Sequence, residues 1–291
     1  MKPSLLRWAI AASVACLLSS SAMSAEIKWG TDLSKALQQL KDQKEKLVLV
    51  DFFTTWCGWC KKLDAETYTD RNVINLVEER FVAVKVDGDK RPNLVSRYEV
   101  QGYPTVVILD SQDRVVKKIV GYRPPQAFLA ELKEALELAS LAKEIPGLEN
   151  QAKADDAQAA QAAAKLGYIY RRLGDEKKAL AYLQQAREAG YRDPGFDLDW
   201  MLATEQGGKL VNDLKSWCNT HTDHPRRWEA LYELGLAQAR MSLWTDALAS
   251  FDAVARGAAE SVWGIRSADL ARTIRERYLR PEASRNCPAC R

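Results

Sequence analysis

The stretch that decides the fold is Leu47-Val48-Leu49-Val50-Asp51-Phe52-Phe53, followed two residues later by Trp56-Cys57-Gly58-Trp59-Cys60. The first part is a nearly continuous apolar run, which is typical of a buried strand. A helix beginning at Cys57 would direct its free backbone N–H groups at that sulfur and favour the thiolate. Because a thiolate is the nucleophile of disulfide exchange and Cys60 is near enough to resolve the product, the stretch predicts a redox site.

Strand and helix patterns alternate around this stretch, from residue 26 to about residue 143. Such alternation predicts an α/β layer structure. Residues 81–87 are apolar enough for a second buried parallel strand, and residues 105–109 and 115–121 predict a hairpin. The patterns also predict helices over residues 32–44, 57–65, 72–79, 91–98 and 126–141.

The first 25 residues have the features of a targeting segment. Lys2 and Arg7 precede an apolar run, and small residues follow up to Ala25. This pattern predicts a secretory signal peptide, cleaved after Ala25 and too short to span a bilayer as a stable helix. We therefore expect a periplasmic or secreted protein without a membrane span. Cys16 could instead carry a lipid, although Ser13 stands where a lipobox normally has Leu.

Composition excludes some classes of partner. The 291 residues are 47% hydrophobic and 28% charged, as in an ordinary folded protein. Without Lys2 and Arg7, 40 of the 42 basic residues remain against 39 acidic ones, so nothing indicates nucleic-acid binding. Export also implies an oxidising compartment for the five cysteines beyond the leader, at positions 57, 60, 218, 287 and 290.

The second half of the chain contains an internal repeat. Glu144-Ile145-Pro146-Gly147 is predicted to break the preceding helix and to mark a linker over residues 144–154. Beyond it, strand patterns vanish. Leu166-Gly167 and Leu234-Gly235 lie 68 positions apart, twice the 34-residue period of helical hairpin repeats, and a degenerate unit with Trp200-Met201 and Trp217 fits between them.

This second half resembles tetratricopeptide repeats over about residues 155–260. Gln238 departs from the pattern, because it lacks the aromatic ring found at Tyr170. The resemblance implies an all-α helical-repeat domain over residues 155–280, with a capping helix over residues 263–278 and a tail over residues 281–291. Stacked hairpins form a groove that suits peptides or helices, so we expect this domain to bind a protein or peptide.

The first half resembles the thioredoxin superfamily over residues 27–140, which supports a domain over residues 26–143. The matching features are Asp51, Trp56-Cys57-Gly58-Trp59-Cys60-Lys61, Lys85 and Gly102-Tyr103-Pro104-Thr105. Residues 61–73 also look like the thioredoxin-like modules of periplasmic electron relays. The fold class expected is therefore a thioredoxin-like α/β domain followed by an all-α domain.

The resemblance implies a catalytic role for four residues and no cofactor. Cys57 would be the attacking thiolate, exposed at the helix start, and Cys60 the more buried resolving sulfur. Asp51 would accept the proton of Cys60, with Lys85 nearby to tune its pKa.

The resemblance also implies a substrate-binding rim. Pro104 would be cis and would place the backbone of Tyr103 where an extended substrate can pair with it. Trp56 and Trp59 would form an apolar rim around Cys57, and Gly121 would allow close backbone approach. Trp59 stands where thioredoxin has Pro, which leaves the direction of electron flow open.

The remaining cysteines admit several interpretations. Cys287 and Cys290 form a second pair that could relay electrons to Cys57 and Cys60, or could be a plain terminal disulfide. Cys218, with His221 and His224, could join that pair in a zinc site, although a metal is not our expectation. Cys57 and Cys60 themselves could be a structural disulfide or half of a zinc site.

The expected function is an exported thiol–disulfide oxidoreductase that acts on protein partners, as a reductase or electron carrier. The alternative is a binding or assembly protein in which the helical repeats act and the thioredoxin-like domain is mainly scaffold. A metal-handling protein is a third hypothesis.

Overall fold

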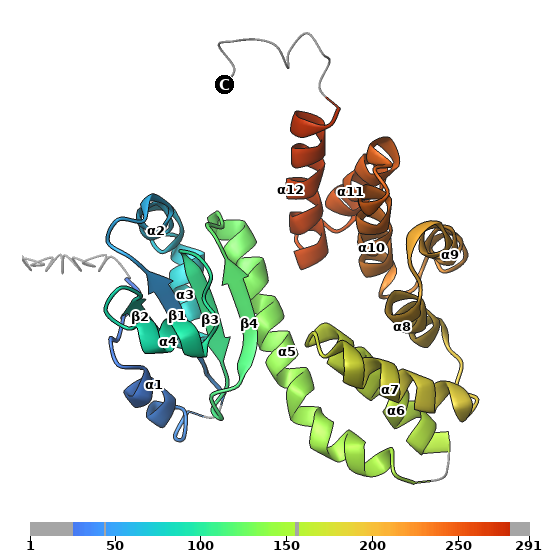
Figure 1. Cartoon of the computed structure of the whole chain (residues 1–291), viewed down its shortest axis with the longest axis horizontal. Helices are drawn as coiled ribbons and strands as arrows, with labels where there is room; N and C mark the ends of the chain where they lie inside the picture. Colours follow the sequence, from blue (N-terminus) through green and yellow to red (C-terminus); the bar gives the residue numbers. More distant parts are fainter. Residues whose placement is uncertain (1–25, 44, 155–156, 280–291) are drawn as a thin grey trace, which may run out of the picture.

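The structure is a computed structural model that describes residues 26–43, 45–154 and 157–279. The predicted signal peptide and the tail with Cys287 and Cys290 lie outside the described residues. The described chain has an α/β part with one sheet, followed by a part built from helices alone (Figure 1).

The α/β part is organised on a four-stranded sheet with the order β2-β1-β3-β4. β1 (Leu47–Phe53) pairs in parallel with β2 (Phe81–Asp87). On its other side β1 pairs antiparallel with β3 (Thr105–Leu109), which continues antiparallel into β4 (Val115–Val120). All four predicted strands are confirmed, and β1, with the apolar run, is a central strand that neighbours cover on both edges.

Helices cover both faces of this sheet. α1 (Leu33–Gln39) and α4 (Pro92–Arg97) pack on one face, and α3 (Arg71–Arg80) and α5 (Pro125–Gln151) on the other (Figure 1). Successive side chains of β1 point to opposite faces, as a pleated strand requires. Both faces of the strand are therefore buried, which explains why its sequence reads as apolar throughout.

The helix that follows the cysteines changes its geometry along its length. α2 (Gly58–Lys62) continues into a π-helical turn, η1 (Leu63–Thr67). The N–H of Tyr68 donates to the carbonyl of Leu63 at 3.0 Å, an i to i+5 hydrogen bond. The helix predicted over residues 57–65 is thus confirmed, but its wider second half turns Tyr68 to a face that regular helical spacing does not predict.

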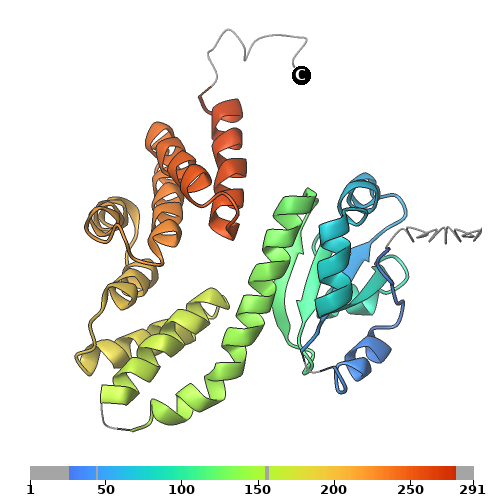
Figure 2. The same ribbon diagram turned by 180° about the vertical axis from the view of Figure 1, so that it is seen from behind.

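The predicted helix break at Pro146 is wrong, because α5 runs through it to Gln151. Proline removes one backbone donor and crowds the preceding turn, which usually kinks a helix rather than dissolving it when its flanks are packed. Here Ile145 and Leu148 pack against the hydrophobic cluster of the following helices. The ribbon of α5 changes direction toward its C-terminal end instead of stopping (Figure 2).

Among residues 157–279, helices alone follow α5, as predicted. They come in three successive pairs and a last helix: α6 (Ala157–Arg172) and α7 (Glu176–Glu188), α8 (Pro194–Thr204) and α9 (Gly207–Thr220), α10 (Arg227–Arg240) and α11 (Trp244–Gly257), and α12 (Val262–Arg277). The last of these confirms the helix predicted over residues 263–278. Within the ranges that the structure describes, no helix is both long and apolar enough to cross a membrane.

Two glycines mark close helix contacts at the same offset in the first and third pairs. A Cβ on Gly167 would lie 2.5 Å from the side chain of Leu183, and one on Gly235 would lie 2.7 Å from Phe251. Each glycine thus faces the residue sixteen positions later, on the partner helix of its pair. This shared geometry accounts for the Leu-Gly pattern seen in the sequence.

Glu134 of α5 joins the two parts of the molecule. Its carboxylate, 6% exposed, lies 2.6 Å from Lys117 of β4 and 3.2 Å from Arg172 of α6, and it also contacts Arg266 of α12. Burial alone would raise the pKa of Glu134, but Arg266 and Lys117 outweigh it and lower that pKa. The helical part therefore curves round so that its last helix returns to α5 (Figures 1 and 2).

Candidate active site

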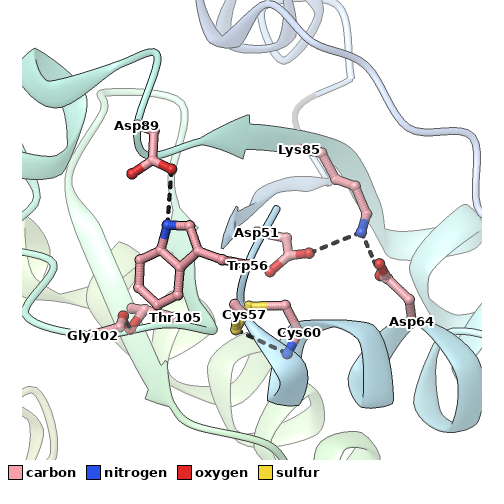
Figure 3. The surroundings of a disulfide bond; sticks show 9 residues. All are labelled: Asp51, Trp56, Cys57, Cys60, Asp64, Lys85, Asp89, Gly102 and Thr105. Atoms are coloured by element: carbon pink, nitrogen blue, oxygen red, sulfur yellow. Dashed lines mark hydrogen bonds and ion pairs between the residues drawn. A yellow bond between two sulfur atoms is a disulfide. The ribbon is translucent and has the colours of Figure 1, made fainter. Parts of the chain in front are cut away.

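The two cysteines lie just beyond the carboxyl end of β1. Cys57 and Cys60 form a disulfide, with their Cα atoms 5.3 Å apart. Cys57 caps the N-terminus of α2, and its Sγ accepts a hydrogen bond from the backbone N–H of Cys60 at 3.0 Å (Figure 3). Once the bond is reduced, the same donor stabilises negative charge on Cys57.

The expected exposure of Cys57 is not found in this oxidised state. Cys57 is 5% exposed and Cys60 is 4% exposed, so the two are equally buried. The difference follows from the disulfide, which ties both sulfurs together at the first turn of the helix. The resemblance implied an exposed attacking thiolate at Cys57, whereas the structure shows the bonded form.

Asp51 and Lys85 face each other across neighbouring strands behind the cysteines. They are paired residues in the register of β1 and β2, and Lys85 Nζ lies 3.3 Å from Asp51 Oδ2. Lys85 also contacts the carboxylate of Asp64 on η1 (Figure 3). Burial raises the pKa of Asp51 to about 6, against the opposing effect of Lys85. A carboxyl group that titrates near neutral pH can both take up and release a proton under physiological conditions.

Two exposed tryptophans each precede one of the disulfide's cysteines in the sequence. Trp56 is 68% and Trp59 is 59% exposed, which is unusual for side chains of this size. The indole N–H of Trp56 donates to Asp89 Oδ2 at 3.0 Å, and its ring meets Tyr103 edge-on with centroids 6.0 Å apart. The ring of Trp59 lies 5.8 Å from that of Tyr122. Both indoles are thus held by neighbours while much of their surface faces solvent.

The loop before β3 has the conformation that the resemblance implies. The Tyr103–Pro104 peptide bond is cis. The carbonyl of Pro104 accepts a hydrogen bond from the N–H of Gly121 at 2.8 Å, and Gly121 has a φ of 81°, which favours glycine. The phenol of Tyr103 packs over Gly88, where an added Cβ would lie 2.1 Å from the hydroxyl oxygen.

The sequence did not predict several residues of this site. Asp64 lies four residues after Cys60, one helical turn on, so helical spacing could have identified it. Asp89 follows β2 as Trp56 follows β1, and the carboxyl ends of parallel strands meet at one edge of a sheet. Tyr68 and Tyr122 carried no such signal, because a π-helical turn places the first and a loop the second.

The other cysteine within the described ranges does not join this site. Cys218 is a free thiol buried in α9, and burial raises its pKa to about 11. His221 and His224 pack against the ring of Trp217, with centroids 4.8 and 5.1 Å away. Within residues 26–43, 45–154 and 157–279, no group of three or more His, Cys, Asp or Glu side chains is placed to hold a metal ion.

Comparison with known proteins agrees with this geometry. The family model described as a thioredoxin-like domain matches residues 33–136. Thioredoxin-1 of Drosophila melanogaster is 32% identical over 91 residues, which are 31% of this chain and 79% of that protein. The chain belongs to the thioredoxin family. The thioredoxin-like domain with its Cys57–Cys60 pair is therefore a thiol–disulfide oxidoreductase domain.

Other relatives match the same part of the chain. The protein disulfide-isomerase of Triticum aestivum is 32% identical over 115 residues, or 39% of this chain and 22% of that protein. The chain thus spans about a fifth of the length of the disulfide isomerases it matches. A thioredoxin from Thermus thermophilus is 30% identical, with a TM-score of 0.35, over 38% of this chain and 86% of that structure.

Proposed function

We propose that this protein is an exported thiol–disulfide oxidoreductase that exchanges disulfides with protein partners through Cys57 and Cys60. The observation that supports this most strongly is the disulfide at the start of α2, directly in front of the buried Asp51–Lys85 pair. The resemblance of residues 61–73 to periplasmic relay modules favours a reductase or an electron carrier.

In the reducing direction the exchange has two steps. The thiolate of Cys57 attacks one sulfur of a partner disulfide, which forms a mixed disulfide and releases the first partner thiolate. Cys60 then passes its proton to Asp51 and attacks the Sγ of Cys57, which releases the second partner thiolate and forms the Cys57–Cys60 disulfide. The partner gains two electrons, so a dithiol donor must reduce the protein before the next cycle.

The partner would bind against the surface around the disulfide. Trp56 and Trp59 offer large apolar faces beside Cys57, and both are mostly exposed. The backbone of Tyr103, next to Pro104, would pair with an extended segment of the partner as a short added strand. Partner recognition would then combine apolar contact with backbone hydrogen bonds.

We propose that the helical pairs are tetratricopeptide-like repeats that hold a protein or peptide near the redox site. A cleft of about 910 Å³ lies along α6–α10, and its lining includes Arg171, Leu180, Glu233 and Met241. Leu180 is 39% and Met241 is 43% exposed, so the lining offers apolar as well as charged contacts. The division into residues 26–143, 144–154 and 155–280 remains part of this proposal.

The cellular location of the protein and the role of its C-terminal tail are proposed from the sequence. The N-terminal Lys2 and Arg7 with the apolar run support export by a signal peptide over residues 1–25. Cys287 and Cys290 would act as a second redox pair. Deleting residues 286–291 should then slow catalytic turnover, while unchanged kinetics would rule out a relay through the tail.

The reductase activity is tested by the reduction of insulin disulfides with dithiothreitol as the electron donor. We expect the wild-type chain to accelerate the reaction and Cys57→Ser to abolish the acceleration. Cys218→Ser is the matched control, because that thiol is buried far along the chain in α9, and it should leave the rate unchanged. Equal rates with and without the wild-type chain would refute the proposal.

The alternative function is that of a binding or assembly protein with the α/β part as scaffold. The cleft along the helices is the observation that favours it. A double variant, Cys57→Ser with Cys60→Ser, separates the two functions. Retention of all biological function by that variant would support the scaffold role, and its loss would support redox exchange.

A further inference from the structure

Two buried oxygen atoms behind the redox site make no hydrogen bond within the described residues. They are Oδ1 of Asp51 and the hydroxyl oxygen of Tyr68. Asp51 is 1% exposed and Tyr68 is 6% exposed, so bulk solvent does not compensate either group. Unpaired polar atoms in a protein interior are unfavourable. We therefore expect these two oxygens to be paired in a different protonation state of Asp51.

Both groups border the same cation, because Lys85 Nζ lies 3.3 Å from Asp51 Oδ2 and 5.3 Å from the centre of the Tyr68 ring. The Tyr68 hydroxyl lowers the pKa of Asp51, in opposition to the larger effect of burial. Burial, and then the charge of Asp51, raise the pKa of Tyr68 well above its ordinary value. The other carboxylate oxygen, Oδ2, is already held by Lys85 at 3.3 Å (Figure 3). Tyr68 is therefore the donor at hand for the oxygen that Lys85 does not hold.

The fold fixes the position of the Tyr68 ring. The ring packs 4.8 Å from that of Trp29 and meets Phe128 edge-on at 5.6 Å. The backbone N–H of Tyr68 closes the π-helical turn, and the hydroxyl of the preceding Thr67 donates to the carbonyl of Arg123 at 2.6 Å. With the ring held on these sides, a hydrogen bond forms only when the Asp51 carboxylate moves toward the hydroxyl, because the two oxygens make none in this structure.

We propose that Tyr68 is a positioning residue of the redox site, whose hydroxyl donates a hydrogen bond to Oδ1 of Asp51 when that carboxylate is ionised. The carboxylate is then held from both sides, by Lys85 and by Tyr68, in the place where it receives the proton of Cys60. Tyr68 itself stays protonated, so no proton passes to or from it. The role of the pair in exchange rests on the proposed function, whereas the hydrogen bond does not.

The pKa of Asp51 also depends on the other charged groups around it. Lys85 of β2 lowers its pKa, and Asp64 of η1 raises it. Its neighbour on β3 is the apolar Val106, and the cysteines of α2 are bonded in the oxidised form. Lys85, Asp64 and Tyr68 also line a pocket of about 290 Å³.

The test is a titration of Asp51 by carbon NMR of the side-chain carboxyl groups, in the oxidised full chain. Asp51→Asn identifies the signal. We expect Tyr68→Phe to raise the midpoint of Asp51 by about one pH unit, because the ionised form loses a donor to a charged group. The matched control is Tyr98→Phe, since Tyr98 is also buried but donates to Asp113, at 2.6 Å, from the other face of the sheet. This control should leave the Asp51 midpoint unchanged.

An Asp51 midpoint that is unchanged or lowered in Tyr68→Phe would overturn the proposal. So would an equal rise in Tyr98→Phe, because a general loosening of the domain would then explain both. The titration reads folded molecules only, so a change in stability does not affect the result. It also needs no redox substrate, so the insulin assay can fail while this titration succeeds, and the reverse.

Discussion

Asp51 shows how one residue can serve chemistry at the expense of stability. It is almost fully buried, and a single cation, Lys85, lies 3.3 Å from one of its oxygens. Burial nevertheless prevails and raises its pKa to about 6. The resemblance of the sequence to the thioredoxin superfamily implied the roles of Asp51 and Lys85. It did not indicate Tyr68, because the π-helical turn that places it has no sequence signal of its own.

Replacing Asp51 should stabilise the oxidised protein at neutral pH. A carboxyl whose pKa is raised on folding destabilises the fold above that pKa, and this penalty vanishes below the unfolded value, near pH 4. The shift of Asp51 from 3.8 to about 6 corresponds to roughly 3 kcal/mol at most. Urea unfolding of Asp51→Asn should thus show a gain at pH 7.5 that disappears at pH values near 4.

Asp64→Asn is the control for that measurement. Asp64 also contacts Lys85 but has a side chain that is 46% exposed, so its replacement should change the free energy of unfolding by less than about 1 kcal/mol. If Asp51→Asn proved less stable than wild type at pH 7.5, the burial penalty assigned to Asp51 would be wrong.

The secondary-structure elements could be predicted from the sequence to different degrees. The four strands were predicted well because both faces of β1 are buried and turns bound each strand. The end of α5 was predicted wrongly, since Pro146 is a local signal whereas the packing of Ile145 and Leu148 is a tertiary one. The first and third helical pairs were predicted through the spacing of their Leu-Gly pairs, because each of these glycines directly contacts the partner helix.

The helix contacts at glycine can be tested by adding one methyl group. Gly167→Ala should lower the free energy of unfolding by about 1–3 kcal/mol, because its Cβ would lie 2.5 Å from Leu183. Gly147→Ala is the matched control within α5, where no atom lies within 4 Å of the added Cβ. There the better helix propensity of Ala should raise stability by about 0.5–1 kcal/mol. Urea midpoints that fall equally for both variants would argue against the close contact.

At the scale of the whole molecule, Glu134 connects the sheet, α6 and α12 through three cations. No sequence pattern predicted this junction, because its members lie far apart along the chain and each alone resembles a surface charge. The junction sets how the helical part stands against the thioredoxin-like domain. A partner held by the helices would therefore meet the domain in a defined orientation.

Glu134→Gln should destabilise the protein by about 3 kcal/mol, since it removes one charge from a buried cluster and leaves Lys117 and Arg266 with a single carboxylate, that of Glu131. Glu137→Gln is the control. The side chain of Glu137 is 51% exposed, and within the described residues its one ion pair is with Arg172, at 3.5 Å. Its effect should stay below about 1 kcal/mol.

Because the pKa of Glu134 is lowered on folding, the difference in the free energy of unfolding between wild type and Glu134→Gln should shrink as the pH falls below about 4. Chemical unfolding at several pH values measures both effects, and equal stabilities for the two variants at pH 7 would contradict the role of the junction.

The proposed redox exchange requires that Cys57 attacks a partner disulfide and that Cys60 resolves the product. Its most direct test is to trap the intermediate with the Cys60→Ala variant and insulin, then to map the linkage by non-reducing electrophoresis and mass spectrometry. We expect a stable mixed disulfide between insulin and Cys57, which Cys57→Ser would prevent. A Cys60→Ala variant that forms no mixed disulfide, or forms it through Cys218, would contradict it.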